Sequence, residues 1–186
     1  MTANIDSILC IGRIQGPKGV KGEVRITAFG ELLGTVKKFS FELYTSKGPI
    51  DGFLLEPQKK QAYNFYNIRA YKENIFLANI EGINSPEAVD GLKGLYLGLS
   101  LQTAKRDFAS DNEPYMFEFL GLAVVDAEEP AIKGQVAAIR EYEGRGWLVA
   151  EIDGREILIP LVAEYVDMST VVDPLPIKGL KFLLEA

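Results

Sequence analysis

The chain has 186 residues, of which 47% are hydrophobic and 25% charged, and its formal net charge is −6. This composition suits one large or two small globular domains. No run of eighteen apolar residues occurs and the N-terminus lacks the pattern of a signal peptide, so we expect a cytoplasmic protein with no membrane segment. The absence of histidine and the single cysteine, Cys10, exclude histidine-assisted nucleophiles, a disulfide framework and a typical zinc site.

The stretch GRIQGPKGVKGEVRI, residues 12–26, is rich in glycine and in Lys and Arg. Its spacing fits neither the Walker phosphate loop nor the dinucleotide-binding fingerprint. Residues 16–19 match the GxxG clamp of KH domains, but that clamp joins two helices, whereas the flanks here are typical of strands. The stretch therefore predicts a glycine-rich connection between two strands, with Lys18 and Lys21 exposed.

Short strands are predicted along the first half of the chain. Apolar and polar residues alternate in three runs, two further runs are apolar, and clusters of Gly, Asn, Pro or Lys separate them. The segments are 23–29, 39–43, 53–55, 66–71 and 75–80, with a hairpin turn at 72–74. In the segment 66–71, Tyr66, Ile68 and Ala70 share one face. Five or six short strands at this spacing favour a barrel or a sandwich.

One short helix is predicted between Ser85 and Gly94. Ser85 suits the N-cap and Pro86 the first helical position. Gly94 suits a left-handed C-terminal cap. We expect about two turns that lie on the first barrel and cover apolar surface.

The second half begins with residues 104–114, which break the strand pattern and are typical of an interdomain linker. Three antiparallel strands are predicted next. They are 135–142, 147–152 and 155–159, joined by turns at 143–146 and at Asp153-Gly154, a strong type I′ signal. Residues 161–166 are expected to form a short helix.

Charge is distributed unevenly along the chain. Residues 1–104 carry twelve Lys or Arg and ten Asp or Glu, a net of +2, whereas residues 105–186 carry eight and sixteen, a net of −8. Between residues 107 and 132 there are seven acids, no Lys or Arg, and interleaved aromatic residues. Such a segment can anchor and steer a basic partner, although Phe117 or Phe119 could instead fill a core. The candidate partner-binding residues are Glu113, Tyr115, Phe117 and Glu118.

An ordered set of motifs resembles the RimM family of ribosome maturation factors. The opening motif is Ile11-Gly12-Arg13-Ile14 followed by Gly16-Pro17, Gly19 and Gly22-Glu23-Val24. Later motifs are Glu87-Ala88, Leu92-Lys93-Gly94, Glu113 with Tyr115, 120–124, 134–136 and 157–160. Two positions depart from the family pattern. Pro114 precedes a lone Tyr115 where paired tyrosines are common, and Lys18 stands where a histidine is frequent.

The resemblance implies an all-β fold of two small β-barrels joined by a short linker, with one short helix in the first. The implied domains are a six-stranded translation-factor-type barrel at 1–103, a linker at 104–112 and a PRC-barrel at 113–186. It also implies an assembly factor that is not an enzyme and has no cofactor. Such a factor binds ribosomal protein uS19 on the precursor of the small (30S) ribosomal subunit and promotes processing of 16S rRNA. We expect a monomer.

A candidate RNA-facing loop consists of Arg13, Lys18, Gly19 and Lys21. A function of another class stays open at this point. The chain could be a flavin- or nucleotide-binding protein, because a small β-barrel can hold either ligand. The missing phosphate motif and the missing histidine weigh against that alternative. A PRC-barrel role in photosynthetic reaction centres is a third reading, which normally brings a membrane segment.

Overall fold

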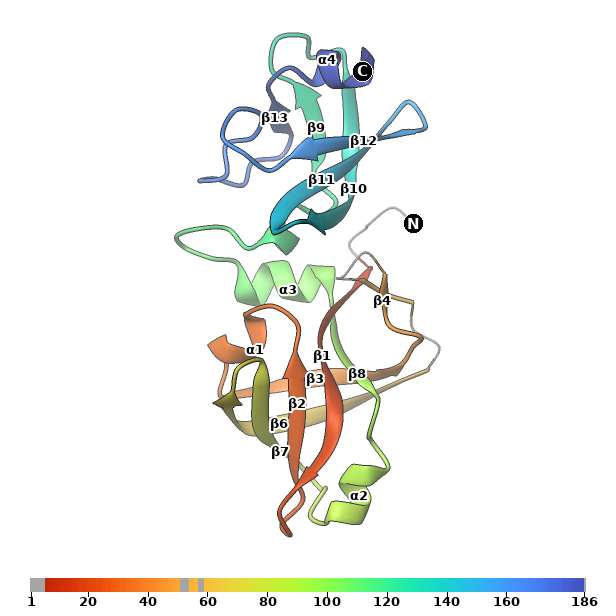
Figure 1. Ribbon diagram of the computed structural model, residues 1–186, viewed down its shortest axis with the longest axis vertical. Coiled ribbons are helices and arrows are strands. Elements are labelled where there is room, and N and C mark those ends of the chain that lie inside the picture. Colours follow the sequence, from red (N-terminus) through yellow and green to blue (C-terminus); the bar gives the residue numbers. More distant parts are fainter. Residues whose placement is uncertain (1–5, 51–53, 57–58, 186) are drawn as a thin grey trace. The chain divides into compact units, whose positions relative to one another are not determined.

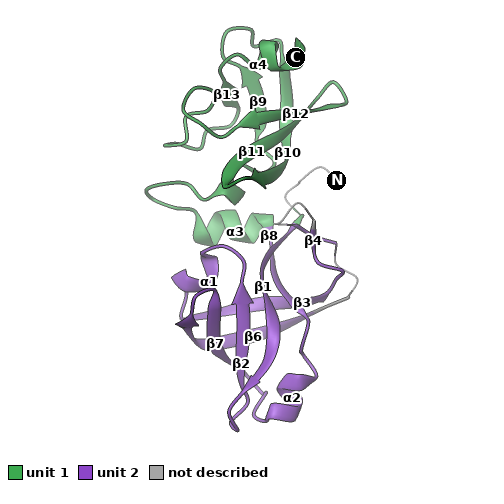
Figure 2. Cartoon of the chain, in the orientation of Figure 1, with its two compact units in different colours: residues 1–7, 101–186 green, residues 8–100 purple. Residues whose placement is uncertain are grey.

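The computed structural model describes residues 6–50, 54–56 and 59–185 (Figure 1). The chain divides into two compact units (Figure 2). The barrel unit comprises Ile8–Ser100, and the C-terminal unit comprises the described residues on either side of it.

The barrel unit is built from a closed ring of six strands. Antiparallel pairings run β1–β2–β7–β6–β3–β8 and return from β8 to β1. Closure leaves no free edge within this ring. Two short strands extend it, because β5 pairs with β1 and β4 pairs with β5. The strands are β1 (Ile8–Lys18), β2 (Glu23–Ala28), β3 (Lys38–Thr45), β4 (Pro49–Ile50), β5 (Leu54–Leu55), β6 (Lys59–Lys72), β7 (Ile75–Ile80) and β8 (Tyr96–Ser100).

Alternating residues of these strands fill the barrel. Val24, Ile26 and Ala28 of β2 are buried, as their alternation predicts. Between β3 and β6, the aromatic rings of Phe41 and Phe65 meet edge to face, with their centroids 5.5 Å apart. Burial of such large apolar side chains is the main favourable contribution to folding. The part of the predicted segment 53–55 that includes Phe53 lies outside the described residues.

The predicted common face of Tyr66, Ile68 and Ala70 is wrong at Tyr66. Phe65 and Ile68 are buried, whereas Tyr66 and Ala70 are exposed. The register of β6 on β7 shifts between Tyr66 and Arg69, and Asn67 adopts a φ of 53°. This irregularity adds one residue between Tyr66 and Arg69, so Tyr66 lies on the opposite face of the strand from Ile68.

Most of the glycine-rich stretch is strand, not loop. The connection between β1 and β2 is confined to residues 19–22. Gly12 is required inside β1 because a Cβ there would lie 2.7 Å from the carbonyl oxygen of Thr27. Gly22 has a φ of 71°, and its Cβ would lie 2.7 Å from the backbone of Asn84. These glycines permit close backbone approach as well as a turn.

The predicted helix of the barrel unit is confirmed as α2 (Pro86–Asp90). The Ser85 hydroxyl accepts a hydrogen bond from the Ala88 amide at 3.2 Å, as an N-cap should. Gly94 has a φ of 87°, and its amide donates to the carbonyl oxygen of Ile14. A second short helix, α1 (Leu32–Thr35), buries two leucines and was not predicted from the sequence.

The C-terminal unit contains a five-stranded sheet of order β12–β11–β10–β9–β13. Its strands are β9 (Ala123–Asp126), β10 (Lys133–Tyr142), β11 (Arg145–Ile152), β12 (Arg155–Pro160) and β13 (Leu175–Ile177). Helix α4 (Leu180–Glu185) contacts both β9 and β12. Helix α3 (Leu101–Phe108) and the 3-10 helix η1 (Met116–Phe119) precede the sheet.

Two hairpin predictions are confirmed in this unit. Asp153 and Gly154 have φ values of 50° and 74°, and Glu143 and Gly144 have 51° and 74°. Paired positive φ values are the signature of type I′ turns. Residues 161–166 form turns and not the expected helix.

The predicted all-β fold class is confirmed, with two sheets of which the first closes. Residues 101–108, which overlap the predicted linker, form α3 and cluster with the C-terminal unit. The boundaries 1–103, 104–112 and 113–186, and the PRC-barrel type of the second domain, stay predictions.

The close approach of β10 to β11 predicts a cost for any side chain at position 134. A Cβ on Gly134 would lie 2.2 Å from the carbonyl oxygen of Glu151. We expect Gly134→Ala to lower the free energy of unfolding by about 1–3 kcal/mol, measured by urea denaturation. The control is Gly91→Ala, where φ is −62° and the nearest atom is 3.4 Å away. Equal stability of both variants would contradict the tight packing.

Candidate functional site

In the acidic and aromatic segment of the C-terminal unit, residues 107–132, several side chains are buried. Glu118 is 7% exposed, and its carboxylate accepts hydrogen bonds from the amides of Tyr115 at 2.8 Å and Ser110 at 3.1 Å. It therefore ties the loop before η1 to the start of that helix, where a negative charge is favourable. Phe117 is 5% exposed and Phe119 is 1% exposed. Both rings contribute to the core of this unit.

Tyr115 and Glu113 lie at the surface of the same segment. Glu113 is exposed and Tyr115 is half-buried. The Tyr115 ring stacks on Phe117 with centroids 5.6 Å apart and an interplanar angle of 14°. Stacking on a buried ring holds the tyrosine in place, as a binding anchor requires. Of the four candidate partner-binding residues, these two are therefore the ones that are available to a partner, and their binding role stays a prediction.

The remaining acids of this segment fall into three groups. Asp107 pairs with Arg106 at 2.6 Å, and Glu129 pairs with Lys181 at 2.6 Å. Asp126 is 2% exposed and bonds to the backbone. Asp111, Glu113 and Glu128 are exposed and have no ion-pair partner among the described residues. The free negative charge is thus smaller than the sequence count of seven.

Asp126 has a structural role. One carboxylate oxygen accepts from the amides of Glu128 and Glu129 at 2.8 and 2.9 Å, and the other from Lys181 at 2.9 Å. The Glu129 amide bond is the main cause that lowers the pKa of Asp126, and the Lys181, Glu128 and Leu180 amides lower it further against the effect of burial. Asp126 therefore joins the turn after β9 to the first turn of α4.

The candidate RNA-facing loop is held by aromatic contacts within the barrel unit. Lys18 donates to the Tyr71 hydroxyl at 3.1 Å and lies 4.8 Å from that ring centroid. This hydrogen bond is the main cause that lowers the pKa of Tyr71. The Arg13 guanidinium lies 5.2 Å from the Tyr96 ring centroid. Gly19 and Lys21 are exposed in the turn, whereas Lys18, which we expected to be exposed, is half-buried at the end of β1.

The structure adds two cations that the sequence reading did not select. Arg25 and Lys93 lie with Arg13 around one pocket on the barrel unit. The signal for Arg25 was present in the alternation of β2, because Arg25 and Thr27 point away from the buried Val24, Ile26 and Ala28. No sequence pattern links Lys93 to them, since it follows α2, some seventy residues further along the chain.

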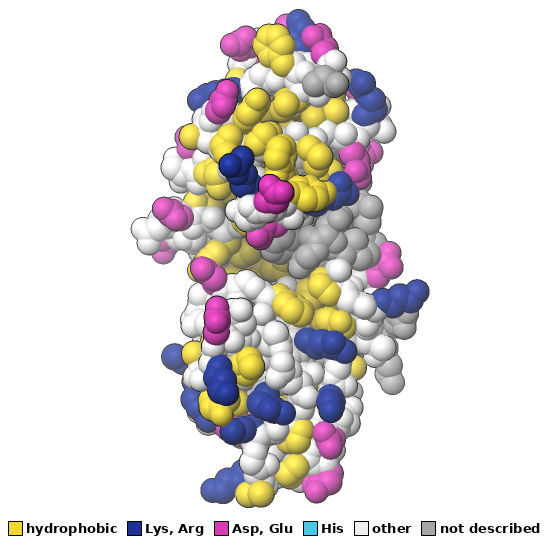
Figure 3. All heavy atoms as spheres, in the orientation of Figure 1, with side chains coloured by type: hydrophobic (Ala, Val, Ile, Leu, Met, Phe, Trp, Pro, Cys, Tyr) yellow, Lys and Arg dark blue, Asp and Glu magenta, His cyan; other side chains and the backbone are white. Residues whose placement is uncertain are grey.

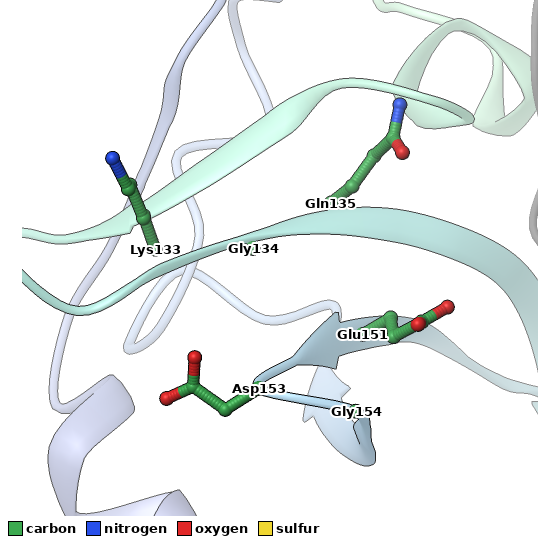
Figure 4. A pocket seen from close by; sticks show the side chains of 6 residues that line it. All are labelled: Lys133, Gly134, Gln135, Glu151, Asp153 and Gly154. Carbon is green, nitrogen blue, oxygen red and sulfur yellow. The ribbon is translucent and has the colours of Figure 1, made fainter.

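A second pocket lies on the C-terminal unit at one end of the β10–β11 pair (Figure 4). Its volume is about 420 Å³, and its lining comprises Lys133, Gly134, Gln135, Glu151, Asp153 and Gly154. Figure 4 shows its side chains pointing in different directions around the hollow. It therefore offers no convergent set of polar groups to a small ligand.

Cys10 has the properties of a core thiol. Its side chain is 2% exposed, and burial is the main effect that raises its pKa to about 12. Within the described ranges, no group of three or more His, Cys, Asp or Glu is placed to hold a metal ion. The helices described here include none that is long and apolar enough to cross a bilayer.

The fold and these surfaces define a two-unit all-β protein with a closed six-stranded barrel and an acidic C-terminal unit. The family model of the RimM N-terminal domain matches residues 9–103. This chain belongs to the RimM family.

The similarity to individual RimM proteins extends into the C-terminal unit. A ribosome maturation factor RimM of Azorhizobium caulinodans is 31% identical over 83% of this chain and 79% of its own length. A ribosome maturation factor RimM of Agrobacterium fabrum is 28% identical over 85% of this chain and 77% of its own length. A crystal structure of a candidate 16S ribosomal RNA processing protein RimM from Pseudomonas aeruginosa is 18% identical in sequence and has a TM-score of 0.41. The match covers 92% of this chain and 96% of the Pseudomonas aeruginosa chain.

The bonds of Asp126 predict an acid-dependent loss of stability. Since its pKa is lower in the folded state, its contribution is full above the unfolded pKa of about 4 and disappears as pH falls through the folded value. At pH 7, Asp126→Asn should lower the free energy of unfolding by about 1–3 kcal/mol, and the deficit should shrink at pH 3. Urea denaturation at both pH values measures this. Glu128→Gln, the same charge change on an exposed neighbour, should have little effect, and a deficit independent of pH would contradict the assignment.

Proposed function

We propose that this protein is a cytoplasmic ribosome maturation factor that promotes processing of 16S rRNA on the precursor of the 30S subunit. Membership of the RimM family is the single observation that carries this proposal. The relatives named above are ribosome maturation factors, and their similarity covers more than four fifths of this chain. The mechanism needs no bond chemistry, because a factor that holds two assembling components together raises their effective concentration.

We infer that ribosomal protein uS19 is the protein partner, and that it docks on the C-terminal unit. Charge supports this inference, because residues 105–186 have a net charge of −8 and would attract a basic ribosomal protein. The exposed Glu113 and the supported ring of Tyr115 supply a carboxylate and an aromatic anchor next to each other. Phe117 and Glu118 are buried and support this surface. The Phe117 ring packs against Tyr115, and the Glu118 carboxylate accepts a hydrogen bond from the Tyr115 amide.

Apolar surface on the same unit also favours a protein partner. Figure 3 shows hydrophobic side chains gathered on the visible face of the C-terminal unit. Its exposed large apolar residues are Tyr142, Leu158, Val162, Met168, Val172 and Phe182. Exposed apolar area bordered by charge is typical of protein-binding surfaces. A basic partner with apolar side chains would match both features.

The barrel unit is the side that we propose to face RNA. Residues 1–104, which include this unit, are close to neutral with a net of +2, so they do not repel phosphate as the acidic half does. Arg13, Lys18 and Lys21 contribute positive charge around the β1–β2 hairpin. Phosphate contacts of this kind position a protein on RNA without reading its sequence.

Co-sedimentation tests the function directly. The full chain should sediment with precursors of the small subunit and be absent from mature 30S particles, because a maturation factor must leave its product. Sucrose-gradient fractions probed for the protein measure this. Equal association with precursor and mature particles would reject a role confined to maturation.

Tyr115→Ala tests the docking surface. The affinity for purified uS19 should fall by about 1–3 kcal/mol if the ring is an anchor, measured by calorimetry at fixed salt. The wild-type affinity should itself decrease with added salt, because the contact is partly electrostatic. Tyr66→Ala, at another partly exposed tyrosine on the barrel unit, is the control and should bind as wild type. An unchanged affinity in a folded Tyr115→Ala variant would remove this residue from the docking surface.

A further inference from the structure

The outer face of β1 and β2 carries a basic pocket beside the turn that follows α2. We call it the Arg25 pocket. Its volume is about 370 Å³, within the range of about 300–1,000 Å³ that ligand sites occupy. Its lining comprises Arg13, Ile14, Gln15, Arg25, Thr27, Lys93 and Gly94. Three of these residues are cationic and none is acidic. Figure 3 shows Lys and Arg side chains gathered over the part of the barrel unit where β1 and β2 face the viewer.

Strand pairing brings the two arginines together. Arg13 and Gln15 of β1 point outward while Ile14 is buried, and Arg25 and Thr27 of β2 point outward on the same side. Arg13 pairs with Thr27 in the register of the two strands. Because the register is fixed by the buried faces, the backbone positions from which the two arginines project are set before any ligand arrives.

Arg25 has an unsatisfied donor at this position. Its Nε is shielded from solvent and has no hydrogen-bond partner among the described residues. A buried N–H without an acceptor costs about 1–3 kcal/mol, so few are left unpaired in folded proteins. A small shift of the Arg25 side chain would turn this N–H toward an acceptor that enters the pocket and would remove this cost. The orphaned Nε is therefore the observation that points to a ligand.

The two other cations are placed to assist. The Arg13 Nε donates to the Gly94 carbonyl oxygen at 3.3 Å, and its guanidinium lies over the Tyr96 ring, which holds the side chain in place. Arginine has five donors, and this bond uses one of them. Lys93 is exposed, and its side chain has no hydrogen-bond or ion-pair partner among the residues that the structure describes.

The neighbouring acids do not neutralise the Arg25 pocket. Glu23, close by on β2, is engaged with Arg69 at 2.5 Å. Asp90 of α2 lies near the rim, since its Oδ1 and the Lys93 Cδ are 3.9 and 3.8 Å from the position of a Cβ on Gly16. Asp90 forms no ion pair with Lys93 in the described part of the chain. Two arginines and one lysine therefore face one acid at the edge.

We propose that the Arg25 pocket binds a phosphate group. Arginine presents donors in a planar fork that matches phosphate oxygens, and lysine adds a point charge. The proposed function supplies one source of the group, the sugar–phosphate backbone of 16S rRNA, and on that source the inference rests on the proposed function. A free phosphate compound has the same chemistry. A contact of this kind positions RNA without selecting its sequence.

Titration with inorganic phosphate tests the pocket itself. In the full-length protein, the Nε–Hε NMR signal of Arg25 should shift saturably with phosphate and not with equal ionic strength of chloride. Lys93→Gln should weaken this binding by about three- to tenfold, because it removes one charged contact from an exposed side chain. Lys38→Gln removes the same charge from β3, which pairs with neither β1 nor β2, and should leave the titration unchanged.

A salt series with RNA identifies the source of the phosphate. A single-stranded 16S rRNA fragment should bind Lys93→Gln and Arg25→Gln less tightly than wild type, without regard to base sequence. The slope of log K against log salt should decrease in magnitude by about 0.7 for each lost contact. If RNA competes with phosphate for the Arg25 signal, the RNA backbone is the ligand. If phosphate shifts the signal and RNA does not compete, the pocket is a site for a free phosphate compound.

The proposal is overturned if neither phosphate nor RNA moves the Arg25 signal, or if both variants match Lys38→Gln in every titration. Co-sedimentation of the same proteins with small-subunit precursors separates this result from the proposed function. A wild type that sediments with precursors while the pocket is inert keeps the function and rejects the site. A wild type that does not sediment rejects the function, whatever the Arg25 signal does.

Discussion

Closure of the barrel through β1 is the constraint on which the surfaces of the barrel unit depend. This strand pairs with β2 along one edge and with β8 and β5 along the other. Such pairing leaves no room for a side chain at Gly12, and it bends the strand where the register shifts. The same pairing sets Arg13 beside β2 and brings the turn after α2 against β1 through the Gly94 amide. The Arg25 pocket therefore depends on the close pairing of β1 with its neighbouring strands.

In the segment 107–132 of the C-terminal unit, some carboxylates are bonded within the fold and others are exposed without an ion pair. Glu118 and Asp126 are buried and accept hydrogen bonds from backbone amides, so their charges are satisfied internally. Asp107 and Glu129 are paired with cations. Within residues 107–132, the exposed acids without an ion pair are Asp111, Glu113 and Glu128, and Glu113 lies close in sequence to the stacked ring of Tyr115. Acidic composition thus overstates the charge that is available for docking.

The two proposals assign opposite electrostatic roles to the two units. A protein partner would meet carboxylates and exposed apolar side chains, whereas RNA phosphate would meet arginines held by strand register and by Tyr96. The separation has a physical reason, because carboxylates near a phosphate site would weaken it through like-charge repulsion. Preorganised arginines also lose less conformational entropy on binding than mobile ones would.

The sequence by itself determined the all-β class, the Ser85 cap of α2 and both type I′ hairpins, because these depend on local alternation, capping and glycine placement. Only the tertiary structure decided the faces of β6, since the bulge at Asn67 depends on pairing with β7. It also decided that Phe117 and Glu118 turn inward, and that Lys93 joins Arg13 and Arg25. Local patterns record what a residue prefers, whereas burial and the convergence of distant residues depend on contacts that form only when the chain closes on itself.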